Sequence, residues 1–334
     1  MINFIFREMT SLKYFIPIVK EASSRNIDST FYIDFCGKYN CPSRHVEALQ
    51  DIIAENNIKI KEISEASNAI GDTIYCEDSG IGCQDNSYKG KKISLIYQND
   101  FFNEFEDSTR YHHFHLKYFD HIVFPSLFFA EFHNCMSDKN LYLGCPKYDV
   151  KIQRENVLQK YKIPKEKNCL LIFPKPRDFH RVELARIIDW LSALGYNVLI
   201  KNREKDRVRG VESLRYYFED YSWHPHTTLE LLSVSDFMIN FGSTTVKEAV
   251  MMQVPLINFP IKPHNKEKTL PFFYEYDYCK SLDPSCKFEE FKEAIDYLTT
   301  SDHKECFKKS ITNHMSFENS SKNIVNFICN FRSV

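Results

Sequence analysis

Four small and hydroxylated residues in a row, GSTT at 242–245, have the chemistry of an anion site. They follow the apolar run FMINF (237–241) and lead into a run with helical periodicity. A helix that begins at such a turn presents free backbone N–H groups and the positive end of its dipole, and the hydroxyls add further donors. The pattern predicts a site for phosphate oxygens, although Ser and Thr are also ordinary helix caps.

Glu248 lies four residues after Thr244, so both residues share one face of the expected helix. A carboxylate in that position can accept hydrogen bonds from two vicinal hydroxyls, such as those of a ribose. Lys247 opposes the helix dipole unless an anion is nearby, whereas an early glutamate is favoured with or without a ligand. The chain has neither the GxxxxGK[ST] loop nor a GxGxxG run after an early strand, so the ATPase and dinucleotide fingerprints are absent.

Cations follow two other apolar runs, in FPKPRD (173–178) and NVLIKNR (197–203). Positive side chains at strand ends can neutralise a departing diphosphate, although lysines and arginines also serve as a solvated surface. The segment SWHPHTT (222–228) adds His224 and His226 as weaker candidates, because a proline turn and a threonine cap explain much of it. The candidate cations are Lys175, Arg177, Lys201 and Arg203.

The first half of the chain offers candidate bases in Asp100, after the apolar run LIYQN, and in the histidines of YHHFH (111–115). Asp100 or His112 could deprotonate a hydroxyl, and His112 would share a helical face with His115. Metal ligation and plain structural histidines are the alternatives. We expect no metal site, because no acidic or cysteine partner stands at a ligand spacing such as HExxH.

These residues must be positioned by an alternation of short apolar runs and helical segments. Runs typical of strands occupy 2–6, 29–35, 58–63, 72–76, 92–98, 120–126, 140–144, 169–177, 197–203, 215–220, 237–241 and the apolar run ending at Pro260. Helical patterns occupy 10–24, 43–56, 110–118, 127–135, 152–161, 181–194, 227–235, 288–300 and 320–331. This alternation predicts an α/β protein with largely parallel sheets covered by helices on both faces.

A polar, lysine-rich segment at 146–168 interrupts the pattern, which then restarts. We therefore predict two Rossmann-like domains of similar size, residues 1–150 and 151–334. No repeat of 20–50 residues is present, which argues against solenoids and propellers.

Composition narrows the function classes. The chain has 334 residues, of which 43% are hydrophobic, enough for two buried cores. A net charge of −2 argues against a general nucleic-acid binder. The eleven cysteines include no CxxC pair, which favours reduced thiols in a cytoplasm. Arg7 and Glu8 interrupt the apolar N-terminal run, so we expect no signal peptide, and no run reaches the length of a membrane span.

The stretch SDFMIN, FGSTTVKEA and MMQVPLINFP resembles the donor-binding half of glycosyltransferases with the GT-B architecture. It is also similar to CDP-glycerol glycerophosphotransferases and UDP-N-acetylglucosamine 2-epimerases. The resemblance is strong over about 25 residues and looser over the two-half layout. It implies two Rossmann-like domains facing a cleft, with the acceptor bound by residues 1–150 and a nucleotide sugar bound by residues 151–334.

Position by position, the resemblance implies phosphate contacts from the turn and a ribose contact from Glu248. The implied donor-binding residues are Lys175, Arg177, Lys201, Arg203, Gly242, Ser243, Thr244, Thr245 and Glu248. This chain differs from those families at two motifs. Several of them have a Lys-x-His-Pro element where this chain has Lys201-Asn202-Arg203. They also often have a His-Gly pair where this chain has Gln98-Asn99-Asp100.

We therefore expect a metal-independent glycosyltransferase without a cofactor. It would move sugar from a nucleotide sugar to a glycan or lipid-linked acceptor in surface polysaccharide assembly. We expect it in the cytoplasm, with peripheral attachment to the inner membrane face left open. The alternatives are glycerophosphotransfer from CDP-glycerol, 2-epimerisation of a UDP-sugar, or a non-catalytic nucleotide-binding partner subunit.

Overall fold

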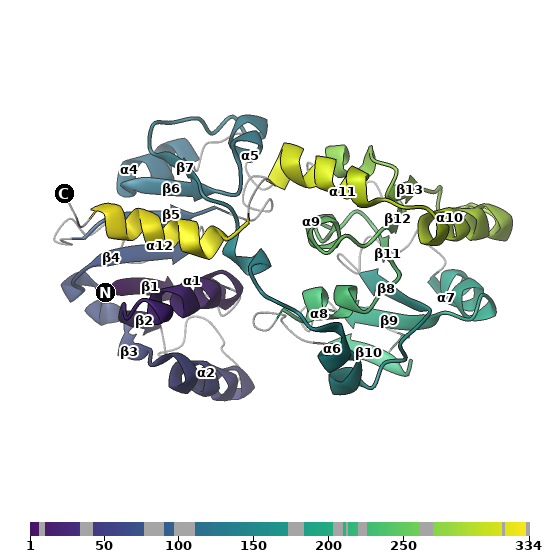
Figure 1. Cartoon of the computed structure of the whole chain (residues 1–334), viewed down its shortest axis with the longest axis horizontal. Helices are drawn as coiled ribbons and strands as arrows, with labels where there is room; N and C mark the ends of the chain where they lie inside the picture. The colour runs from purple at the N-terminus through teal and green to yellow at the C-terminus, as the bar shows by residue number, and fades with distance from the viewer. Residues whose placement is uncertain are drawn as a thin grey trace. The chain divides into compact units, whose positions relative to one another are not determined.

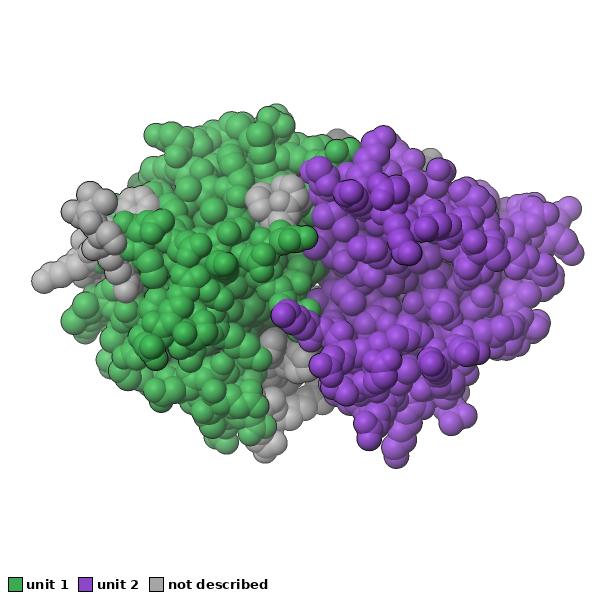
Figure 2. Space-filling model, in the orientation of Figure 1, with its two compact units in different colours: residues 1–150, 313–334 green, residues 151–312 purple. Residues whose placement is uncertain are grey.

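The computed structural model describes residues 1–6, 11–33, 43–76, 90–96, 111–172, 184–202, 210–211, 213–219, 226–260, 270–315 and 318–331. They divide into two compact units, which Figure 2 distinguishes by colour. Unit 1 comprises Met1–Val150 and Asn313–Val334, and unit 2 comprises Lys151–Thr312. Each unit is built on one sheet of parallel strands.

The sheet of unit 1 has the strand order β3-β2-β1-β4-β5-β6-β7. Its strands are β1 (Ile2–Phe6), β2 (Ser29–Ile33), β3 (Lys59–Glu62), β4 (Asp72–Cys76), β5 (Lys92–Leu95), β6 (His121–Phe124) and β7 (Asn140–Tyr142). All neighbouring pairs are parallel. Residues 29–33 are buried throughout, as a strand covered on both faces requires, whereas the edge strand β3 alternates between exposed and half-buried residues.

The helices of unit 1 come from both ends of the chain. They are α1 (Leu12–Ser24), α2 (Ser43–Asn56), α4 (Leu116–Tyr118), α5 (Leu127–Phe132) and α12 (Ser320–Phe331), with 3-10 turns η2 (Ile63–Asn68) and η4 (Pro146–Tyr148). Figure 1 shows α12, in yellow, beside α1 and the sheet of this unit, and α1 and α12 are in contact.

The C-terminal helix belongs to unit 1, whereas we expected the second domain to extend to residue 334. Asp149 accepts hydrogen bonds from the Ser320 and Ser321 backbone N–H groups at 3.2 and 2.6 Å. Arg25 Nη1 donates to Asn326 Oδ1 at 2.6 Å. These bonds and the buried apolar face of α12 join it to unit 1. An amphipathic sequence predicts the helix but does not say which sheet it covers.

The sheet of unit 2 has the order β10-β9-β8-β11-β12-β13. Its strands are β8 (Asn168–Ile172), β9 (Asn197–Asn202), β10 (Tyr216–Glu219), β11 (Phe237–Asn240), β12 (Leu256–Asn258) and β13 (Cys279–Ser281), all paired in parallel. Its helices are α6 (Arg154–Tyr161), α7 (Leu184–Ala193), α8 (Thr227–Ser233), α9 (Val246–Met251), the 3-10 turn η6 (Pro271–Tyr274), α10 (Phe288–Thr300) and α11 (Lys304–Ser310).

Helices cover both faces of this second sheet. Leu171, Ile200 and Ile239 pack with Leu191 of α7 and Phe291 of α10 in one buried cluster. Figure 1 shows α8 and α9 on the other face. The burial of β8, β11 and β12 on both sides explains their almost uninterrupted apolar sequences. The α/β fold class with two parallel sheets is therefore confirmed.

The structure differs from the expected elements at two places. The helix expected at 110–118 is a π-helical segment, Tyr111–His115, followed by the short α4. A helix that the sequence did not predict, α11, lies between α10 and a second π-helical segment, Ile311–Met315. Among the described helices none is both long and apolar enough to cross a membrane.

Candidate functional site

The order of the strands in unit 2 reverses between β8 and β11. From β8 the chain builds the sheet outward through β9 and β10, and it then returns to add β11, β12 and β13 on the other side. Ile172 and Asn240 end these two central strands and are paired with each other. In an open parallel sheet, ligands bind beyond the carboxyl ends of the strands at such a reversal. The GSTT turn follows β11 directly, so the topology places it at the reversal.

The turn is held by the last residue of β11. Asn240 Oδ1 accepts the Ser243 backbone N–H at 3.1 Å. Gly242 has a φ of 72°, in the left-handed region that favours glycine. The Ser243 hydroxyl accepts the Thr245 backbone N–H at 3.3 Å and forms a hydrogen bond with the Thr245 hydroxyl at 3.0 Å. The local sequence thus forms a compact turn in which the Ser243 and Thr245 hydroxyls are hydrogen-bonded to each other.

Helix α9 is short, with six residues, and Thr245 precedes it without a side-chain cap. Thr245 is therefore not an ordinary N-cap of α9. The first turn of α9 contains Lys247 and Glu248, which are only 6% and 8% exposed. Burying two charged side chains at consecutive positions lowers the stability of the fold unless polar partners compensate for the lost hydration.

Glu248 is brought next to a histidine from another helix. His226, which precedes α8, places its Nε2 atom 4.0 Å from Glu248 Oε1, and its residue is 6% exposed. The two helices are in contact. Glu230 on α8 accepts hydrogen bonds from Lys160 Nζ at 2.9 Å and from the Tyr161 hydroxyl at 2.5 Å, which joins α8 to α6. From the sequence His226 is a weaker candidate, because a proline turn and a threonine cap explain much of its segment. No local signal joins it to Glu248, which lies 22 positions later.

Asparagines end three of the parallel strands at this same edge. They are Asn202, Asn240 and Asn258, all buried. Asn240 Nδ2 donates to Asn258 Oδ1 at 3.1 Å and to the Tyr274 hydroxyl at 3.0 Å. Buried amides therefore end three neighbouring or nearby strands at this edge of the sheet. The recurrence of asparagine after these apolar runs is visible in the sequence alone.

The predicted cation Lys201 lies near the carboxyl end of β9, beside β8. Its residue is 5% exposed, and Nζ donates to the Asn202 carbonyl at 2.8 Å. A buried lysine is not a solubility residue, so the surface interpretation fails for this position. The other three predicted cations, Lys175, Arg177 and Arg203, lie outside the described residues.

In unit 1, the predicted base Asp100 also lies outside the described residues. His112 is exposed, and its ring centroid lies 5.1 Å from that of Tyr111. His115 is fully buried and shares a 3.0 Å hydrogen bond with the Ser94 hydroxyl. The expected common face of His112 and His115 is therefore wrong, because the wider π-helical turn points them into different environments. In the described part of the chain, no cluster of three or more His, Cys, Asp and Glu side chains could hold a metal.

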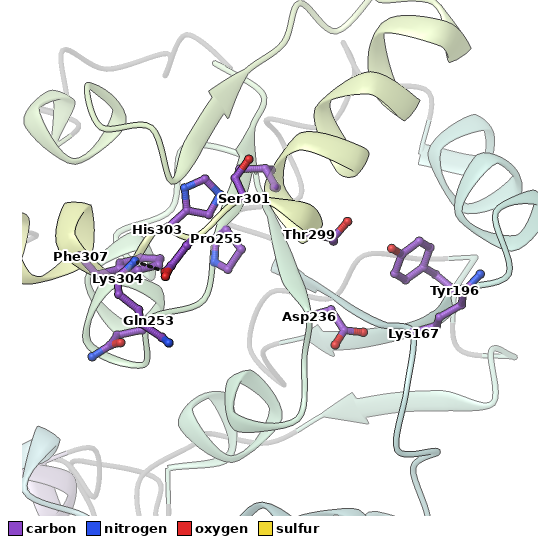
Figure 3. Close-up of a pocket in the computed structure, with 12 residues that line it drawn as sticks. Lys167, Tyr196, Asp236, Gln253, Pro255, Thr299, Ser301, His303, Lys304 and Phe307 are labelled. Carbon is purple, nitrogen blue, oxygen red and sulfur yellow. Dashed lines mark hydrogen bonds between the residues drawn. The ribbon is translucent and has the colours of Figure 1, made fainter.

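A cavity of about 490 Å³ lies at the opposite edge of the same sheet. Lys167, Tyr196 and Asp236 line it, and each directly precedes a strand. Figure 3 shows these three side chains together with Ser301 and His303 from the connection between α10 and α11. Since all strands run in parallel, this cavity is at the amino edge, away from the turn.

No protein-family profile matches the sequence, and no curated protein sequence matches it significantly. Solved structures do resemble it. The wall teichoic acid polymerase TagF, in a CDPG soak, has a TM-score of 0.68 and 13% identity over 99% of this chain and 88% of that one. The glycotransferase of kitacinnamycin has a TM-score of 0.61 and 9% identity over 98% of both chains.

A third similar structure is the spinosyn forosaminyltransferase SpnP, with a TM-score of 0.58 and 10% identity over 100% of this chain and 99% of that one. All three likenesses cover both units, and each unit has its own parallel sheet. The chain has the GT-B fold. In a GT-B fold, unit 2 is the C-terminal half, which places the GSTT turn in the half that the sequence resemblance associates with donor binding.

Proposed function

We propose that this protein is a glycosyltransferase that binds a nucleotide sugar at the carboxyl edge of the unit 2 sheet. The observation that carries the proposal is the position of the hydroxyl turn and the buried Glu248 at the reversal of strand order. The GT-B fold and the similar transferase structures support it. The acceptor is proposed to be a glycan or a lipid-linked acceptor that unit 1 binds.

In the proposed reaction, an acceptor hydroxyl attacks the anomeric carbon of the donor sugar. A base in the first half, Asp100 or His112, takes the hydroxyl proton. The bond between the anomeric carbon and the phosphate oxygen breaks, and its electron pair leaves with the nucleotide. The hydroxyls of Ser243, Thr244 and Thr245, with Lys201, stabilise that charge. Lys175, Arg177 and Arg203 are proposed to assist.

Glu248 is proposed to accept hydrogen bonds from the two ribose hydroxyls of the donor. Because Glu248 is only 8% exposed, these bonds form away from bulk water. Hydrogen bonds to a charged group contribute about 1.5–3 kcal/mol each. Loss of Glu248 should therefore weaken nucleotide binding by a factor of roughly 10 or more.

A thermal-shift screen with UDP, CMP, CDP, GDP and ADP tests the proposal. At 100 times its Kd a ligand stabilises the folded state by about 2.7 kcal/mol, so one nucleotide should raise the Tm by several degrees. The matched control is Glu305→Ala, an exposed acid in the first turn of α11. It should retain the full shift, and Glu248→Ala should lose about half of it or more. The proposal is wrong if no nucleotide stabilises the wild type, and the ribose assignment is wrong if Glu248→Ala responds equally.

A second candidate is glycerophosphotransfer from CDP-glycerol, which the TagF likeness and its TM-score of 0.68 favour. The products separate the two reactions. Glycosyl transfer from a nucleoside diphosphate sugar breaks a carbon–oxygen bond and releases the nucleoside diphosphate. Glycerophosphotransfer breaks the phosphoanhydride and releases CMP from CDP-glycerol. Release of neither product, with nucleotide-dependent stabilisation retained, would instead indicate a non-catalytic binding subunit.

A further inference from the structure

Tyr274, at the end of η6, lies beside the turn although 29 positions separate it from Thr245. Its hydroxyl oxygen is 3.0 Å from Asn240 Nδ2, and Asn240 Oδ1 is 3.1 Å from the Ser243 backbone nitrogen. The turn and the phenol are therefore joined through a single carboxamide. η6 is also in contact with α9 and β13.

The hydrogen-bond directions in this group follow from one fixed donor. The Ser243 backbone N–H can only donate, so Asn240 must present its oxygen to it. The amide nitrogen of Asn240 then faces both Asn258 and Tyr274. Since both hydrogens of that nitrogen are donated, Asn258 presents its oxygen and Tyr274 presents a lone pair.

The O–H hydrogen of Tyr274 consequently takes no part in the bond with Asn240. Among the residues that the structure describes, this hydroxyl makes no other hydrogen bond. Burial raises the pKa of the Tyr274 phenol well above its usual value, so the hydroxyl remains protonated near neutral pH. Tyr274 is half-buried, so this hydrogen is available to an acceptor on a ligand that binds at the turn.

We propose that Tyr274 is a ligand-binding residue of the GSTT turn, whose O–H donates to a phosphate oxygen while its lone pair accepts from Asn240. This inference rests on the proposed function, because it takes the ligand of the turn to be a nucleoside diphosphate group. Ser243, Thr245 and Tyr274 then form one set of donors on an anion, with Asn240 as the residue that aligns them.

Tyr274→Phe removes the O–H and leaves the ring, which makes it the test. Affinities are measured by calorimetry for the nucleoside diphosphate that stabilises the wild type and for its parent nucleoside. We expect the diphosphate to bind about 10-fold more weakly to Tyr274→Phe, and the nucleoside to bind within about twofold of wild type. A tyrosine that only supports the fold would weaken both ligands alike.

Tyr278→Phe is the matched control. Its hydroxyl is buried in the same unit and shares a 2.8 Å hydrogen bond with Ser310, so its loss has a comparable structural cost away from the turn. It should bind both ligands as the wild type does. Equal diphosphate affinity in Tyr274→Phe and wild type, or equal losses for both ligands, overturns the role of Tyr274 and leaves the proposed function intact. A wild type that binds no nucleotide overturns both.

Discussion

The two edges of the unit 2 sheet differ in what their polar groups do. At the amino edge, which has the open cavity, Asp236 accepts the Asn168 backbone N–H at 2.8 Å and Lys167 donates to the Leu194 carbonyl at 3.1 Å. These charges hold strands and helix ends together. At the carboxyl edge, a turn of hydroxyls and buried charges gathers where the strand order reverses. Our proposal therefore places the donor site by the chemistry of an edge and not by the volume of a cavity.

The largest effects should come from a matched pair of asparagines, one at each edge. Asn240 and Asn168 are both fully buried, and each side chain makes three hydrogen bonds. Replacement by Ala leaves several buried groups without partners, so each variant should lose about 3 kcal/mol of unfolding free energy in urea titrations. Only Asn240→Ala should also weaken nucleotide binding. Equal binding losses in both variants would remove the distinction between the edges.

A smaller effect should separate two lysines. Lys201 is buried near the carboxyl end of β9, whereas Lys167 is exposed at the amino edge. Lys201→Met should weaken diphosphate binding about 10-fold, because a charge-assisted hydrogen bond contributes about 1.5–3 kcal/mol. Lys167→Met should leave the calorimetric Kd unchanged. If the Lys167 variant lost affinity instead, the anion would bind at the wrong edge for our proposal.

The smallest difference should appear between two threonines. Thr245 shares its hydroxyl with Ser243 in the turn, whereas the Thr299 hydroxyl donates to the Ile295 carbonyl within α10, at the cavity. A neutral hydrogen bond contributes about 1 kcal/mol, so Thr245→Val should raise the diphosphate Kd by roughly fivefold. Thr299→Val should not change it. Identical Kd values for the two variants would show that the Thr245 hydroxyl does not contact the ligand.

Much of the fold could be predicted because its signals are local. Runs buried on both faces, such as NCLLI (168–172) and FMIN (237–240), are nearly uninterrupted in apolar character, and the structure confirms them as strands. Helix α10 occupies the predicted residues 288–300. The π-helical segment at 111–115 could not be predicted in this way, since the 3.6-residue period gave no sign of the wider turn.

The candidate site also combines residues that local sequence patterns identify with contacts that only the tertiary structure makes. The sequence by itself determined the turn, its hydroxyls and the nearby Glu248, since these lie within seven consecutive residues. Tertiary structure alone decided that His226 lies against Glu248, that Tyr274 reaches Asn240, and that α12 returns to unit 1. The physical reason is that periodicity and capping report neighbours along one element. The order in which parallel strands assemble is what brings distant residues to the same edge.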